Sequence, residues 1–114
     1  MELSFSGFNE NAATFFAREG VAAGAPVKIT ENGTVGPCAE GDGFCGVALN
    51  VRNGYAAVQL TGYTRLPYAG AAPAAGWQQL AAAEGGKAQV SGAGGRTLLV
   101  TDVDETEKTC GFIL

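Results

Sequence analysis

The amino-acid sequence predicts a single small all-β domain. Turn signals rich in Gly, Asn and Asp recur about every eight to twelve residues, which is the spacing of short strands joined by tight turns. The chain has 114 residues, which suffices for one modest core but not for a second independent core. Because 18 residues are Gly and many others are Ala, the core must come mainly from the aromatic, Val, Leu and Ile residues.

The clearest strand signal is the run over residues 55–67, which is rich in β-branched and aromatic residues and ends at Pro67. Its expected partner is the segment 44–51. Asn53-Gly54 between the two favours a type I′ hairpin turn, which requires a positive φ at both central residues. We therefore expect one long β-hairpin in the middle of the chain.

Further strands are expected on both sides of this hairpin, over residues 26–30, over 77–82 paired with 87–90, and over 97–104 paired with 108–114. The alanine-rich run over residues 69–83 has high intrinsic helix propensity. Pro73 and Gly76 interrupt it, and the remainder is too short to be helical on propensity alone. We expect strand and turn there.

Residues 1–12 differ from the rest and are expected to form an N-terminal arm that precedes a single domain over residues 13–114. Leu3 and Phe5 alternate with serines, and the pattern then breaks at Gly7 and a polar Asn-Glu-Asn cluster. Such a pattern is typical of a detachable strand. The alternative is an integral first strand of the domain.

Charge and hydropathy exclude several classes of partner. The net charge is −4, and the seven Lys and Arg residues are dispersed, so we expect no nucleic-acid binding. No apolar run approaches the about 18 residues that span a bilayer, and the N-terminus lacks the pattern of a signal peptide, so we expect a cytoplasmic protein without membrane contact. Only 16% of residues are charged, which fits either a surface buried in an assembly or simply an Ala/Gly-rich composition.

Catalytic chemistry has little support in the sequence. There is no His, so Ser-His-Asp and Cys-His arrangements are impossible and the commonest metal ligand is missing. Cys38, Cys45 and Cys110 match neither a C-x-x-C redox motif nor a zinc pair, and we expect small buried thiols rather than reactive or cross-linking ones. A Ser-Lys or paired-carboxylate mechanism is formally open, but no serine stands in a nucleophile motif.

Two motifs resemble ligand sites only superficially. An EF-hand loop starting at Asp102 would require Gly and Glu where this chain has Glu107 and Ile113, so a solvated strand end is favoured. The glycine-rich segment 91–96 lacks the remaining residues of a dinucleotide-binding or P-loop motif, so a hairpin connection is favoured. We expect no enzyme activity, no catalytic residue, no metal and no cofactor.

Several segments form, in order, a pattern of turns and strand starts: VAAGAPVKI (21–29), NGTV (32–35), GDGFCGVAL (41–49), AVQLTGYTRLP (57–67), AGWQQL (75–80) and VTDVD (100–104). This pattern resembles the small head decoration, or capsid cement, proteins of tailed bacteriophages and their prophages. The resemblance covers about residues 20–114 and implies a β-barrel or β-tulip-like fold. It also implies a structural protein of the virion that forms homotrimers on the capsid surface after a stay in the host cytoplasm.

The partner that the resemblance implies is the major capsid protein. In such proteins a flexible N-terminal segment adds a strand to a capsid sheet, and residues 1–11 occupy that place here, with Leu3, Phe5 and Phe8 as expected capsid-binding residues. If the arm is instead integral to the domain, the loops 41–44 and 68–76 are the expected contacts. The alternatives are another phage head or tail structural protein, or a small non-viral β-barrel that binds a ligand or assists an enzyme.

Overall fold

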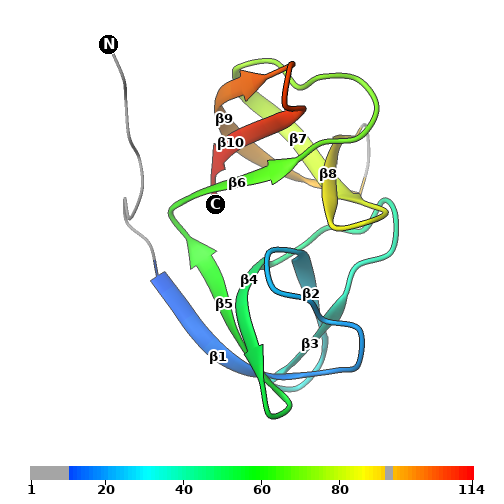
Figure 1. Ribbon diagram of the computed structural model, residues 1–114, viewed down its shortest axis with the longest axis vertical. Helices are drawn as coiled ribbons and strands as arrows, with labels where there is room; N and C mark the ends of the chain where they lie inside the picture. Colours follow the sequence, from blue (N-terminus) through cyan, green and yellow to red (C-terminus); the bar gives the residue numbers. More distant parts are fainter. Residues whose placement is uncertain (1–10, 92–93) are drawn as a thin grey trace.

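The computed structural model describes residues 11–91 and 94–114, and every regular element in this part of the chain is a β-strand. The N-terminal half forms a small closed barrel and the C-terminal half forms a separate five-stranded sheet. Figure 1 shows the barrel and the second sheet as two lobes, one above the other. The predicted all-β fold with a small β-barrel is confirmed.

The barrel consists of five strands: β1 (Asn11–Ala17), β2 (Pro26–Glu31), β3 (Thr34–Pro37), β4 (Gly46–Arg52) and β5 (Tyr55–Thr61). They follow the order β1-β3-β2-β4-β5, and β1 closes the barrel by pairing antiparallel with β5 and parallel with β3. The parallel pairing involves only the last part of β1, at Phe16 and Ala17. Closure is therefore confined to one end of that strand.

The second sheet also has five strands: β6 (Tyr63–Pro67), β7 (Gly76–Ala83), β8 (Lys87–Val90), β9 (Arg96–Asp104) and β10 (Thr109–Ile113). Their order is β6-β10-β9-β7-β8, which places β6 and β8 at the edges. A parallel bridge between Tyr68 and Ala88 brings these two edges together just after β6 ends. The sheet therefore curls toward closure on itself.

The predicted hairpin turn is confirmed, but the long strand after it is not a single strand. Asn53 and Gly54 have φ values of 52° and 80°, as a type I′ turn requires. Gly62 has a φ of 98°, a conformation that is costly for any residue with a side chain. The chain bends there, so that β5 remains in the barrel and β6 enters the second sheet.

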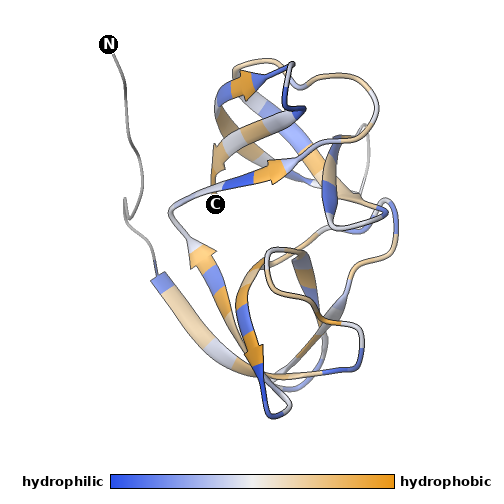
Figure 2. Cartoon of the chain, viewed as in Figure 1, coloured by the Kyte–Doolittle hydropathy of each residue, from blue (hydrophilic) through white to orange (hydrophobic). Residues whose placement is uncertain are grey.

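The alternation of buried and exposed residues explains why these segments form strands. In β5, Ala56 and Val58 are fully buried inside the barrel, whereas Tyr55 faces outward and is exposed. Figure 2 shows this alternation as changing bands of hydropathy along the strands. The alanine-rich segment also follows the prediction, because Gly76–Ala83 is strand β7 and no helix forms there.

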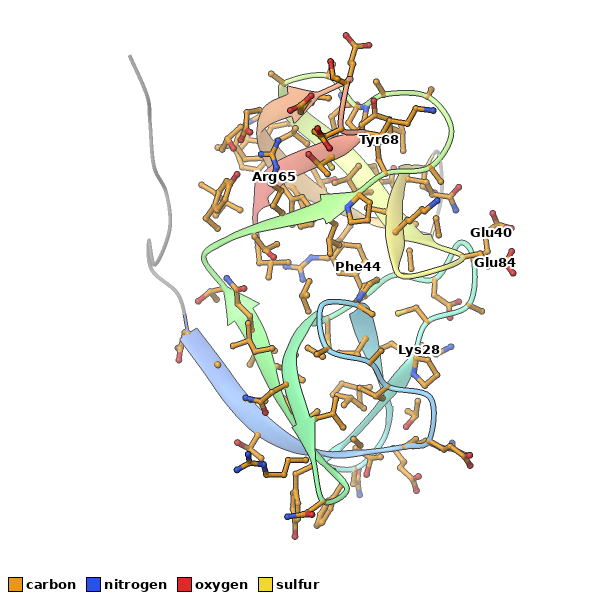
Figure 3. All side chains as sticks on the ribbon, in the orientation of Figure 1. Lys28, Glu40, Phe44, Arg65, Tyr68 and Glu84 are labelled. Atoms are coloured by element: carbon orange, nitrogen blue, oxygen red, sulfur yellow. The ribbon has the colours of Figure 1, made fainter. Side chains whose placement is uncertain are left out.

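The expectation of one core is wrong, because the buried side chains form two clusters. The barrel cluster contains only small residues: Val27, Val35, Ala48, Ala56 and Val58. The cluster of the second sheet is larger and contains Phe44, Val47, Leu66, Tyr68, Leu80, Ala82, Ala88, Leu98, Val100, Cys110 and Phe112. Phe44 and Val47 belong to the N-terminal half of the chain, so the barrel contributes side chains to the other core. Figure 3 shows Phe44 between the two lobes.

Residues 38–45, here called the crossing segment, join the lobes by backbone hydrogen bonds. Gly41 N donates to Ala82 O and Ala82 N donates to Asp42 O, both at 2.8 Å. Arg96 at the start of β9 donates from Nη1 to Cys45 O at 3.2 Å. A Cβ on Gly43 would lie 2.9 Å from the carbonyl oxygen of Gly94, so this close approach requires glycine.

Replacement of Phe44 by Ala should strongly destabilise the whole protein. Phe44 is 2% exposed and its ring centroid lies 6.1 Å from that of Phe112, so the substitution leaves a cavity and should cost about 3 to 5 kcal/mol. Phe16→Ala is the matched control, because Phe16 is 56% exposed and its loss should cost about 1 kcal/mol or less. Urea unfolding measures the free energy of unfolding of both variants. Equal losses of stability in the two variants would contradict the role of Phe44 in the core of the second sheet.

Candidate partner-binding site

The capsid-binding residues expected from the sequence, Leu3, Phe5 and Phe8, lie outside the described residues. The described chain begins at Asn11, which pairs with Thr61 in β5, and Ala12 pairs with Gln59. The last two residues of the expected arm are therefore strand residues of the barrel. Sequence analysis did not identify β1, although its inward residues Phe15 and Ala17 pack against the barrel core.

The N-terminal part of β1 has one open edge. Ala17 N donates to Gly54 O at 2.8 Å on the β5 side, and Phe16 N donates to Gly33 O at 2.9 Å on the β3 side. Backbone groups alternate in direction along a strand, so those of Ala12 and Thr14 point to the same side as those of Phe16. Pairing with β3 starts only at Phe16. Within residues 11–91 and 94–114, no strand pairs with this side of residues 11–15. We call this side of β1 the open edge.

The open edge lacks the charged residues and prolines that commonly protect an edge strand against pairing with another chain. Edge strands are commonly guarded by Lys, Pro or an inward-pointing charge. β1 has the sequence NAATFFA and β5 has the sequence YAAVQLT, so neither strand contains a charged residue or a proline. The register of the β1–β5 pairing shifts at a β-bulge between Asn11 and Ala12. This uncharged ribbon is suited to receive an extended backbone.

An exposed aromatic pair lies next to the open edge. Phe16 and Tyr55 are direct partners in the β1–β5 ladder, and their ring centroids lie 5.2 Å apart with an interplanar angle of 31°. They are 56% and 48% exposed. Paired aromatic side chains that are left on a surface are typical anchors for a protein partner. The backbone edge and the apolar contact therefore occur together.

The alternative docking loop at residues 41–44 is partly engaged within the protein. Phe44 is buried in the core of the second sheet, and Gly41 and Asp42 are hydrogen-bonded to Ala82. The Gly-rich composition of this loop allows a close approach between the lobes, while Gly41 and Gly43 stay exposed. A role of the loop in docking stays a prediction. The other predicted loop, residues 68–76, is anchored by the buried Tyr68 and Pro73 and otherwise exposes mainly small apolar side chains.

The outer face of the second sheet carries a partly exposed apolar row. Strand pairing places Tyr63, Ile113, Leu99 and Trp77 side by side across β6, β10, β9 and β7. Trp77 is 69% exposed. Beside this row Arg65 forms an ion pair with Asp102, which also accepts a hydrogen bond from the Tyr63 hydroxyl at 3.2 Å. The face combines apolar contact area with charges that are already paired.

Several ionisable groups of the described chain have structural partners. Hydrogen bonds from Lys28 and from Ala39 N hold the pKa of Asp42 below its usual value, and the Lys28 Nζ to Asp42 Oδ2 distance is 2.6 Å. Burial tends to raise the pKa of Asp102, but hydrogen bonds from Thr101 and Arg65 outweigh it and lower the pKa. Asp104 Oδ1 accepts from Thr106 N and Glu107 N at 3.0 Å each. These carboxylates thus serve ion pairs and a turn.

The thiols are held in the protonated form. Burial raises the pKa of Cys38 and of Cys110 to about 11, and burial also raises that of Cys45. A thiol with such a pKa is a poor nucleophile near neutral pH. All three cysteines are free. Their positions fit packing and give no sign of an activated thiol.

A groove of about 450 Å³ lies between the loop after β1 and the β7–β8 turn. Its wall consists of small residues such as Gly20, Ala23, Pro26, Pro67 and Gly86, and Cys38 contributes its thiol. Ligand and catalytic sites usually present several convergent polar side chains, which this wall lacks. Among residues 11–91 and 94–114, no three His, Cys, Asp or Glu side chains come together in a way that could hold a metal ion.

In the same described ranges, no helix is long and apolar enough to cross a membrane. No protein-family model matches the chain, and a comparison with curated protein sequences gives no match. The geometry of the described residues is therefore the main guide to function. The open edge of β1 with its aromatic pair is the strongest candidate for a partner-binding site.

The ion pair of the crossing segment predicts a stability that depends on pH. The pKa of Asp42 is lower in the folded chain than its ordinary value of 3.8. The stability that the ion pair contributes is therefore fully present above pH 3.8 and is lost as the pH falls through the folded pKa. Asp42→Asn should therefore be less stable than the unmodified protein at neutral pH. The two proteins should converge in acid below the folded pKa.

Urea unfolding at a series of pH values measures this difference. Glu40→Gln is the control, because Glu40 is an exposed carboxylate on the same crossing segment (Figure 3) that forms no hydrogen bond or ion pair with any other side chain that the structure describes. It should not alter the stability at any pH. A stability difference between Asp42→Asn and the unmodified protein that persisted unchanged in strong acid would contradict the role of the ion pair.

Proposed function

We propose that this protein is a capsid decoration protein of a tailed bacteriophage or prophage, which binds the outer lattice of the major capsid protein and stabilises it. One observation carries the proposal: the barrel has an open, uncharged strand edge at β1, and residues 1–10 directly precede this edge in the chain. A protein that fastens neighbouring subunits together needs a stable body and a segment that can complete a partner's sheet. The sequence resemblance to capsid cement proteins points to the same role.

Other strand edges in the described residues are less suited to strand addition. β2 pairs with β4 only at Pro26 and Val27, so the rest of these two edges is also unpaired, but it carries charged side chains: Lys28, Glu31 and Arg52. In the second sheet the edge strands β6 and β8 have five and four residues and are bridged by Tyr68 and Ala88. Short and covered edges pair poorly with other chains. Strand addition to a capsid sheet therefore falls to β1 and to the residues before it.

The surface chemistry supports a protein partner rather than a polyanion. The chain carries a net charge of −4, and Lys28 and Arg65 are already engaged by Asp42 and Asp102. Exposed Phe16, Tyr55 and Trp77 offer apolar contact area instead. No nucleic acid, membrane or cofactor is part of the proposed function, and the role is structural rather than catalytic.

Attachment is expected to depend on several weak contacts acting together. In the proposed homotrimer, three short strands reach one lattice at once, and the binding of the first raises the effective concentration of the others. The protein would therefore bind tightly only to an assembled shell. The protein would stay in the host cytoplasm until shells form and would then be part of the virion surface.

Deletion of residues 1–10 should abolish or strongly weaken attachment to capsids while the melting temperature stays nearly unchanged. The deletion keeps β1 and both cores intact, so only the segment proposed to pair with the capsid is lost. Co-sedimentation with shells of the major capsid protein encoded in the same genome measures attachment. The full-length double variant Leu3→Ser with Phe5→Ser is the control for chain length and should also bind weakly.

Two outcomes would contradict this assignment. If the deletion variant unfolds, residues 1–10 are an integral part of the domain rather than a docking arm. If it binds shells as tightly as the full chain does, the arm has no role in attachment.

A further inference from the structure

We propose that Asn32 is a site of spontaneous deamidation and that its conversion to isoaspartate opens the seam of the barrel, by which we mean the short pairing of β1 with β3. The chain has two Asn-Gly turns, Asn32-Gly33 between β2 and β3 and Asn53-Gly54 between β4 and β5. Both turns are exposed. The inference concerns the chemistry of these turns and does not depend on the proposed function.

The reaction takes place within the chain and consumes only water. The backbone nitrogen of Gly33 forms a bond to Cγ of Asn32, and the bond from Cγ to the side-chain nitrogen breaks. That nitrogen leaves as ammonia with the proton of the Gly33 N–H, and a five-membered succinimide ring remains. Water then opens the ring at one of its two carbonyls, which gives aspartate or isoaspartate. Glycine favours ring closure because it has no Cβ that obstructs its nitrogen.

The backbone conformation of Asn53 protects it from this reaction. Its φ is 52°, which lies in the left-handed region, where ψ is about 47°. At these angles the nitrogen of Gly54 lies nearly opposite Cβ of Asn53 across the Cα–C bond, so it cannot reach Cγ. The pairing of Arg52 with Tyr55 on either side of the turn holds this conformation. The ring can close there only after the end of the hairpin has opened.

Asn32 is not held in this conformation. Among the described residues other than glycine, only Asn53 and Lys108 have a positive φ, so Asn32 has a negative φ. In the allowed regions at negative φ the next nitrogen lies beside Cβ rather than opposite it, and a smaller rotation brings it to Cγ. The β2–β3 register also shifts between Ile29 and Glu31, just before the turn. Such a bulge interrupts the ladder that would otherwise restrain Asn32.

The Asn32-Gly33 turn takes part in the seam. Gly33 O accepts a hydrogen bond from Phe16 N at 2.9 Å, and a Cβ on Gly33 would lie 4.0 Å from Cδ2 of Phe16. The seam is short, because β1 and β3 pair through only two residues of each strand. Isoaspartate lengthens the main chain before Gly33 by one methylene, which displaces this carbonyl. It also adds a negative charge directly after Glu31, and the two like charges repel.

Ageing of the folded full-length protein in neutral to mildly alkaline buffer tests the site, and peptide mapping by mass spectrometry detects the exchange of an amide for an acid. We expect Asn32 to convert at least about tenfold faster than Asn53, because opening the hairpin adds to the barrier at Asn53. The same chain unfolded in urea is the matched control. Both asparagines then precede a glycine in a flexible chain and should convert at similar rates. Asn32→Gln should abolish the fast conversion, because its longer side chain cannot close a five-membered ring.

Amide hydrogen exchange of the aged protein tests the effect on the seam. Exchange at Phe16, which donates to Gly33 O, should become faster, whereas exchange at Ala17, which donates to Gly54 O, should change much less. The Asn32→Gln variant aged in the same way should show no change at either amide. Methylation by an isoaspartyl methyltransferase distinguishes isoaspartate from aspartate in the aged chain.

Several results would overturn the inference. If Asn53 converts as fast as Asn32 in the folded protein, or if both stay amides while the unfolded chain converts, the assignment of the site is wrong. If the methyltransferase detects no isoaspartate, or if isoaspartate forms and Phe16 exchanges as slowly as in fresh protein, the effect on the seam is wrong. None of these results bears on attachment to capsid shells.

Discussion

The paired hydrogen bonds between the crossing segment and Ala82 hold the two sheets together as one body. Each lobe comprises only about half of a small chain, and such small units bury too little apolar surface to be more than marginally stable alone. Gly41 and Asp42 therefore extend the hydrogen bonding of β7 into the N-terminal half, while Phe44 fills the core of the C-terminal half. The Lys28–Asp42 ion pair and the Arg96 contacts fix the same segment from both sides. Stability of either lobe depends on this junction.

A body joined in this way can present a strand edge without losing its shape. The inward side chains of β1, Phe15 and Ala17, pack against the barrel core, so the strand is anchored while one of its edges stays open. The pairing with β5 fixes the direction of every backbone group along that edge. This is the relation between the fold and the proposed function. The side chains packed inside the barrel hold β1 in place, so the backbone hydrogen-bonding groups along its open edge have a fixed direction before a partner binds.

Local signals allowed much of the fold to be predicted from the sequence. Asn53-Gly54 identified the central hairpin because the required positive φ values are a property of those two residues. The β7–β8 and β9–β10 pairs also followed from turns between nearby strands. By contrast, β3 is only four residues long and contains Gly36, so it lacked a strand signal. The break at Gly62 was hidden inside an apparently continuous strand.

The parts that sequence analysis missed depend on contacts between distant residues. Nothing near Phe44 indicates that it packs against Phe112, and the glycines of the crossing segment suggested an exposed loop rather than a close approach to Ala82. The open edge likewise follows from where β3 begins relative to β1, which is a property of the tertiary structure. Leu3, Phe5 and Phe8 remain predictions from the sequence. The exposed pair of Phe16 and Tyr55 could have been suspected only once their strands were known to be neighbours.

An electron cryomicroscopy reconstruction of capsid shells mixed with the purified protein is the most direct measurement of the proposed role. The expected result is a shell decorated with homotrimers, in which β1 of each copy lies in strand register with a segment of the major capsid protein. Shells that remain bare, or copies that attach through the outer face of the second sheet with β1 turned to solvent, would contradict it.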